Sequence, residues 1–97
     1  MSNKGELFPI FEIRKFINKI LNELQENDNK NCCEIFDRHF QNLVKNYNLE
    51  VIILRYCTAP EIKSAQYRYG SDYLEKKVNI ILFQKVLNAI SKRHYRK

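Results

Sequence analysis

The stretch from Thr58 to Gly70 constrains the fold more than any other part of the chain, because signals for both ends of a helix occur in it. Thr58 and Glu61 have the spacing of a capping box, in which a hydroxyl and a carboxylate each bind a free backbone N–H at a helix start. Pro60 fits the first turn, where its missing N–H is tolerated, and Gly70 can adopt the left-handed conformation that often ends a helix. The stretch therefore predicts a short helix over residues 59–69.

Apolar residues at steps of three and four predict an amphipathic helix near the start of the chain, from Pro9 onward. They are Ile10, Ile13, Ile17, Ile20 and Leu24. The polar residues 25–31 interrupt this pattern and mark a loop, since their side chains compete for backbone hydrogen bonds. Asn31, with Glu34 three residues later, is expected to cap the next helix.

Residues 32–56 have two interpretations. One is a single long helix, whose buried face would consist of Cys33, Phe36, Phe40, Leu43, Tyr47, Val51 and Leu54. The other ends the helix at residues 46–48 and makes 51–54 a buried strand, because a short β-branched run is ambiguous by period alone. We favour the single helix, since the sequence offers no second strand candidate. The strand would need a partner that supplies a sheet edge.

The last segment predicts a helix from Asp72 to about Arg93 that is apolar nearly all round. Asp72 and Glu75 have the spacing of a second capping box, directly after the helix predicted at residues 59–69 ends. Gly70 is therefore predicted to be a corner between two helices. A helix of this kind is either central to the core or shared with another chain. The candidate partner-binding residues are Phe83, Leu87 and Ile90, bulky side chains that a small core need not cover.

Together these segments predict one all-α domain of four helices at residues 9–93, with an N-terminal extension at 1–8 and a basic tail at 94–97. A chain of 97 residues allows one compact core. Its 44% hydrophobic and 29% charged residues, with two Gly and two Pro, are typical of a folded helical domain rather than a disordered one.

Residues suited to catalysis or metal binding are scarce. Cys32, Cys33 and Cys57 lack the spacing of a zinc site or a disulfide framework, so we expect free thiols in a reducing, intracellular compartment. His39 would lie on the same helix as Cys33 without an oxyanion donor, so we expect no enzyme, no metal and no other cofactor. No apolar run reaches the roughly 18 residues of a membrane span, and no signal-peptide pattern is seen, so no membrane association is expected.

The positive charge is concentrated in the C-terminal half. The net charge is +6; residues 1–54 contain 7 basic and 8 acidic side chains, and residues 55–97 contain 10 and 3. This asymmetry suggests a polyanion or an acidic protein as partner; the alternative, at least as common, is a basic face that contacts only solvent. Tyr67 and Tyr69 flank Arg68, and such interleaving suits base stacking. For these two tyrosines we favour instead a buried ring with a solvated hydroxyl.

The run from Thr58 through Glu61, Ile62 and Ala65 to Gly70 resembles the loop and last core helix of histone-fold proteins, over 13 of the 97 residues. The predicted order of helices is compatible with that fold carrying an extra C-terminal helix. The resemblance implies an obligate head-to-tail dimer with another helical subunit, a nuclear location and contact with the DNA backbone. The implied nucleic-acid-binding residues are Arg55, Lys63 and Arg68 in the core and Lys92, Arg93, Arg96 and Lys97 in the tail.

The expected function is therefore that of a non-enzymatic, basic helical subunit of a nucleoprotein complex, which dimerises with a partner and binds DNA phosphates electrostatically. The alternative is a helical protein–protein adaptor that binds no nucleic acid. In that case the apolar last helix docks into a partner, and the basic surface meets an acidic protein.

Overall fold

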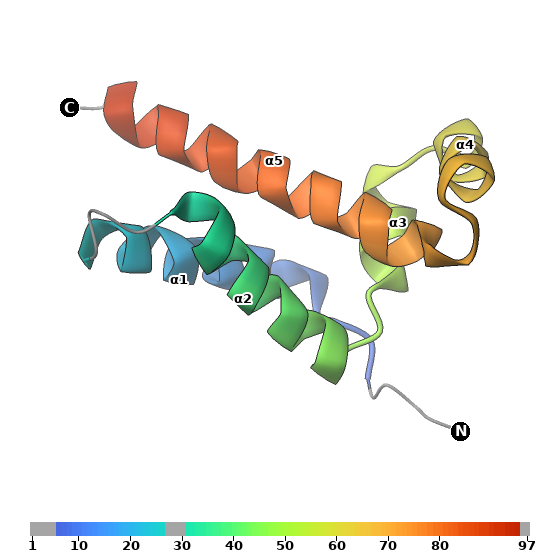
Figure 1. Cartoon of the computed structure of the whole chain (residues 1–97), viewed down its shortest axis with the longest axis horizontal. Helices are drawn as coiled ribbons and strands as arrows, with labels where there is room; N and C mark the ends of the chain where they lie inside the picture. The colour runs from blue at the N-terminus through green and yellow to red at the C-terminus, as the bar shows by residue number, and fades with distance from the viewer. Residues whose placement is uncertain (1–5, 27–30, 96–97) are drawn as a thin grey trace.

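The chain is all-α, as the sequence predicts (Figure 1). The computed structural model describes the backbone of residues 6–26 and 31–95 and the side chains of residues 6–25 and 31–92. In chain order the elements are the 3-10 turn η1 (Ile10–Glu12), α1 (Ile13–Glu26), α2 (Cys32–Asn46), α3 (Glu50–Tyr56), α4 (Ala59–Tyr69), the 3-10 turn η2 (Gly70–Asp72) and α5 (Tyr73–Tyr95). Extended pairing in the described ranges amounts to one isolated bridge, between Leu7 and Asn48.

Helix α5 is the central element of the fold. It is 23 residues long and packs against all four other α-helices, with α1 and α2 along its length and α4 at one end (Figure 1). Val78, Leu82 and Val86, at steps of four, are 0% exposed. Burying three such side chains contributes roughly 5–9 kcal/mol before chain entropy is subtracted. That is comparable to the net stability of a whole small domain.

Aromatic rings join α1, α2 and α5 in the core. Phe36 packs edge-on against Phe16 of α1, with ring centroids 6.0 Å apart, and against Phe83 of α5, at 5.0 Å. Phe40 stacks on Phe36 at 5.7 Å and is 1% exposed. These contacts fix the separation of the three longest helices, because ring pairs favour edge-on or offset geometry.

The single helix predicted for residues 32–56 is wrong, because the chain leaves the helical path at Tyr47 and starts α3 at Glu50. The backbone of Asn48 is engaged elsewhere. Its N–H donates to the carbonyl of Glu6, and its carbonyl accepts from the N–H of Phe8, both at 3.0 Å. Its side-chain oxygen accepts from the N–H of Glu50 at 2.9 Å. An asparagine that makes such bonds competes with helix continuation. The preference for helix over strand at residues 51–54 is confirmed.

The break also changes which residues face the core. Cys33 and Leu54, both assigned to the buried face of the long helix, are exposed, and Leu54 is 65% exposed. Cys32 instead packs partly against the core. The buried residues of the two helices are Ile35, Phe36, Phe40 and Leu43 in α2 and Ile52 and Ile53 in α3.

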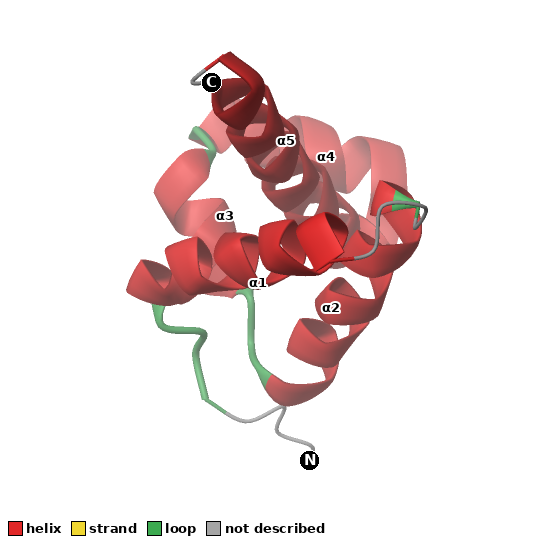
Figure 2. Ribbon diagram, turned by 90° about the vertical axis from the view of Figure 1, so that its left-hand side faces the viewer, coloured by secondary structure: helices red, strands yellow, loops and turns green. Residues whose placement is uncertain are grey.

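The segment before α1 belongs to the packed structure. Phe8, placed by the sequence in an N-terminal extension, is 3% exposed and packs edge-on against Tyr47 at 5.4 Å. Figure 2 shows this segment running beside the connection between α2 and α3. Core packing therefore begins before Pro9.

The predicted ends of α4 are confirmed. The Thr58 N–H donates to Glu61 Oε1 at 2.8 Å, and the Glu61 N–H donates to Thr58 Oγ1 at 3.4 Å, so both halves of the capping box form. The Thr58 bonds lower the pKa of Glu61. At the other end Gly70 has φ +65°, which an L side chain rarely adopts. The expectation of a buried ring at Tyr67 is wrong, since that side chain is 94% exposed.

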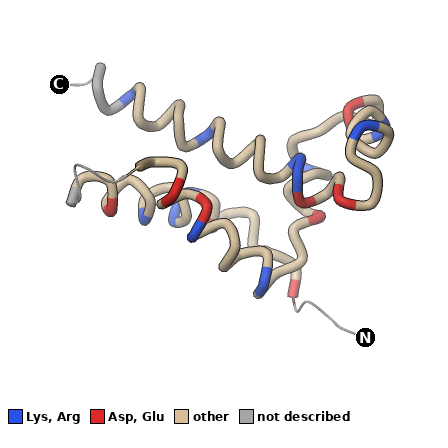
Figure 3. Tube along the Cα trace, in the orientation of Figure 1, with Lys and Arg blue, Asp and Glu red and all other residues tan. Residues whose placement is uncertain are grey.

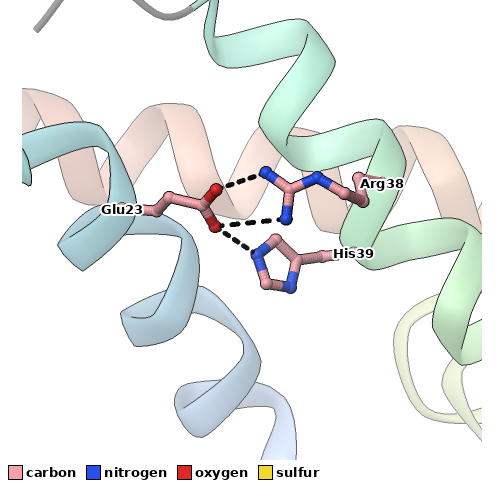
Figure 4. A network of polar contacts seen from close by, with 3 residues as sticks. All are labelled: Glu23, Arg38 and His39. Carbon is pink, nitrogen blue, oxygen red and sulfur yellow. Dashed lines mark hydrogen bonds and ion pairs between the residues drawn. The ribbon is translucent and has the colours of Figure 1, made fainter. Parts of the chain in front are cut away.

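A polar cluster holds α1 against α2 (Figure 4). The guanidinium of Arg38 donates to both carboxylate oxygens of Glu23, and His39 Nε2 lies 2.9 Å from Glu23 Oε1. The hydrogen bonds from Arg38 and then His39 lower the pKa of Glu23 to about 2. His39 also packs edge-on against Phe16, with centroids 6.5 Å apart. The imidazole of His39 therefore packs and hydrogen-bonds between α2 and α1.

Candidate binding groove

A groove of about 630 Å³ lies where η1 and α1 meet α3 and α5. Its position follows from the fold, because α3 diverges from α2 at Asn48 and reaches the side of α5 that faces α1. Residues from four elements line it, and apart from the polar Asn88 they divide into a cationic set and an apolar set. The cationic set is Arg14, Arg55, Lys85 and Lys92. The apolar set is Ile10, Phe11, Ile13, Ile17, Tyr56 and Ala89.

The cations give the groove a positive field. Arg14, Arg55 and Lys92 are exposed, Lys85 is half-buried, and no Asp or Glu is among the described residues that line the groove. Like charges around one concave surface reinforce each other's potential and attract anions from beyond contact distance. Along α5 in Figure 3, basic positions occur near its start and again further along, whereas acidic ones lie only near its start.

Lys85 and Tyr56 form a pair on the groove wall. The Lys85 ammonium lies over the Tyr56 ring, 4.2 Å from its centroid, which is a cation–π geometry. Tyr56 is 41% exposed. The pair holds α3 and α5 together and covers one face of the tyrosine ring.

The apolar part of the groove is mostly aliphatic. Ile10 and Ile17 are partly buried against the core, and Ala89 of α5 lies at intermediate exposure. Phe11 is 79% exposed, which is unusual for so large an apolar side chain. An exposed aromatic next to a concave apolar strip with a charged rim is typical of an interaction surface.

The structure brings together only some of the predicted nucleic-acid-binding residues. Arg55 and Lys92 share the groove, whereas Lys63 and Arg68 are exposed on α4 and do not line it. Arg96 and Lys97 lie outside the described residues, as does the side chain of Arg93.

Sequence reasoning missed two of the groove cations. Lys85 had a usable signal, since Lys85, Asn88 and Lys92 recur at helical spacing and so share one face of α5. Arg14 had none, because it joins the others only through tertiary packing.

The predicted partner-binding residues of α5 have different environments. Phe83 packs on Phe36, and Ile90 packs partly against the core, so both side chains are engaged within the chain. Leu87 is 40% exposed and remains accessible to a partner.

A second depression, lined by residues of α2 and α5, has the opposite charge. Glu34 and Asp37 line it with Phe36, Asn79 and Phe83. The positions that α5 contributes to the two depressions flank its buried residues on either side. The cationic groove and the acidic depression therefore lie on opposite sides of the buried stripe of α5.

The groove is lined, among the described residues, by the titratable side chains of Arg14, Arg55, Tyr56, Lys85 and Lys92. Its described lining contains no Cys, Ser, His, Asp or Glu. In the described part of the chain no three His, Cys, Asp or Glu side chains are grouped so as to hold a metal. The three cysteines are free thiols, and burial raises the pKa of Cys32 and of Cys57.

None of the helices in the described ranges is both long and apolar enough to cross a membrane. Comparison with known proteins finds no matching family model, no matching curated protein and no matching solved structure. The histone-fold resemblance at residues 58–70 stays a prediction from the sequence.

Proposed function

We propose that this protein is a non-enzymatic helical interaction subunit that binds an anionic partner in the groove between α1, α3 and α5. The observation that carries the proposal is the convergence of Arg14, Arg55, Lys85 and Lys92 on one concave surface that has no carboxylate in its described lining. Because these cations come from three different helices, the positive surface exists only in the folded chain.

The groove favours an acidic protein over nucleic acid as that partner. Its aliphatic strip offers no hydrogen bonds, which leaves Asn88 and the Tyr56 hydroxyl as the uncharged hydrogen-bonding groups of the described lining, and one face of the Tyr56 ring is already covered by Lys85. Binding to single-stranded nucleic acid relies on free aromatic faces alternating with cations. A protein segment can use both parts of the groove, with apolar side chains on the strip and carboxylates at the rim.

Nucleic-acid contact is the second candidate, in the form that the sequence predicts. Lys63, Tyr67 and Arg68 are all exposed on α4, and Tyr67 is 94% exposed. This is a free aromatic with cations beside it, as stacking and phosphate contact require. Under this candidate the chain contributes phosphate neutralisation to a nuclear nucleoprotein complex, and binding falls steeply with salt.

The histone-fold resemblance adds a second helical subunit to this candidate. The long central helix that such pairing normally uses is divided here into α2 and α3. The dimer is therefore proposed on the sequence resemblance alone, and the groove proposal does not depend on it.

Affinity purification of three tagged forms, with and without nuclease treatment, tests the proposal. The forms are the wild type, the groove double variant Arg14→Glu/Lys92→Glu and the α4 double variant Lys63→Glu/Arg68→Glu. All four residues are exposed, so the fold should be retained, which circular dichroism checks. We expect stoichiometric protein partners that resist nuclease, persist on the α4 variant and disappear from the groove variant.

Two other results would decide against the groove. Identical partners on the wild type and the groove variant would refute it as the binding surface. Partners lost on nuclease treatment and on the α4 variant would establish the nucleic-acid candidate instead.

A further inference from the structure

The occupant of the groove can be specified further. We infer that the groove binds an acidic amphipathic α-helix of a partner protein, laid along α5 with its apolar side on the aliphatic strip. This inference rests on the proposed function and adds the secondary structure, charge and spacing of the bound segment.

The shape of the groove favours a helix over an extended peptide. An extended peptide usually gains affinity by adding a strand to a free sheet edge. The described residues form no sheet, and neither Leu7 nor Asn48, which make their single isolated bridge, lines the groove. Helical walls on each side instead offer a trough into which a helix places residues at steps of three and four.

The charges on α5 set a spacing for the partner. Lys85 and Lys92 are seven residues apart on one helix, and both line the groove. Two helical turns place them about 10.5 Å apart along the axis. A helix that lies beside α5 presents carboxylates at the same interval when Asp or Glu recur every seven residues. Arg14 and Arg55, from α1 and α3, contribute charge from the other walls.

The apolar part of the groove supplies most of the binding free energy, which charged contacts at the rim do not provide. Phe11 is 79% exposed at the groove wall, next to the strip formed by Ile10 and Ile17. Covering this ring removes a large apolar surface from water, which favours binding. Charges at the exposed rim are screened by water and salt, so each contributes less than this apolar contact. The bound helix should therefore carry leucines facing Phe11 and carboxylates on both flanks.

A designed probe tests this inference with the full chain. The probe is a fluorescein-labelled peptide of about 16 residues, with leucines at helical spacing on one face and glutamates seven residues apart on the flanks. Three comparison ligands are used: the same peptide with lysine for glutamate, the same peptide with two central prolines, and a single-stranded oligothymidine. Fluorescence anisotropy gives each dissociation constant at low and moderate salt.

Matched variants localise the binding. Lys92→Glu and Phe11→Ser alter the groove, and Lys63→Glu and Tyr67→Ser make the same types of change at exposed positions of α4. We expect the acidic helical peptide to bind the wild type. Each groove variant should weaken it about tenfold or more, which corresponds to about 1.4 kcal/mol. The α4 variants should stay within about twofold, because they lie outside the groove.

The inference is overturned if the acidic peptide fails to bind, if its proline-containing form binds equally well, or if all four variants behave alike. Tighter binding of oligothymidine that depends on the groove residues would overturn it in favour of nucleic acid. The proposed function can survive these results. If the groove double variant loses its cellular partners while the acidic peptide fails, the groove binds an anionic partner of another kind.

Discussion

Replacement of Leu82 by alanine should remove a large part of the chain's stability. Leu82 is 0% exposed at the centre of α5, where it faces the core shared with the other helices. The substitution deletes three carbons, worth about 2.4 kcal/mol of transfer free energy at roughly 0.8 kcal/mol each. The incompletely relaxed cavity adds to this, so the total loss should be about 3–4 kcal/mol. A small domain of this kind has only about 5–15 kcal/mol in all.

Leu87→Ala is the matched control, because the same three carbons are deleted from the same helix. Leu87 is 40% exposed, so only about three-fifths of the transfer free energy applies, roughly 1.4 kcal/mol as an upper bound, and no closed cavity forms. Urea unfolding followed by circular dichroism measures both losses, provided that the slope with urea stays constant. Equal losses at the two positions would refute the packing described here, and would show that Leu87 is buried in the species being unfolded.

Three further predictions concern local contacts. Thr58→Ala should lower the free energy of unfolding by about 1 kcal/mol through loss of the α4 cap, and a Thr58→Ser variant should restore most of it in the same unfolding assay. The pKa of Glu23 is about 2 in the folded chain, below its ordinary 4.5, so its contribution to stability is full above pH 4.5 and is lost as pH falls toward 2. Glu23→Gln should therefore flatten the acid limb of a plot of melting temperature against pH, and an unchanged limb would contradict the role of the cluster. Cys33, the exposed thiol, should react with iodoacetamide before the other two cysteines, as peptide mass mapping would show, since burial raises the pKa of both of those thiols.

The starts of α2 and α4 could be predicted from the sequence because their signals are local, whereas the second box predicted at Asp72 and Glu75 does not form, and α5 begins at Tyr73 after the turn η2. The Thr58–Glu61 box and the Asn31 cap each involve atoms within three residues, and both form as predicted. The single helix predicted for residues 32–56 fails at Asn48 because the signal there is not local. The bonds that divide α2 from α3 join Asn48 to Glu6 and Phe8, about 40 residues earlier in the chain. Hydrogen bonds between residues so far apart in the chain produce no periodic pattern in the sequence.

The candidate site was predictable only in part for the same reason. Arg55 and Lys92 are among the basic residues that the histone-fold resemblance implies as phosphate contacts, and both line the groove. Arg14 was not selected, because it looks like one of several solvated cations on an amphipathic helix. Tyr67 was expected to bury its ring, which α4 leaves exposed because only Ala65 of that helix is buried.

The sequence by itself determined the helical class, the bounds of α4, the corner at Gly70 and the concentration of positive charge in the C-terminal half. Each of these depends on neighbouring residues or on composition. Tertiary structure alone decided the division of α2 from α3 and the convergence of Arg14, Arg55, Lys85 and Lys92 on one groove. The reason is physical: helix caps and amphipathic faces are formed by atoms a few residues apart, whereas a groove depends on how separate helices cross. That crossing is set by packing among α1, α3 and α5.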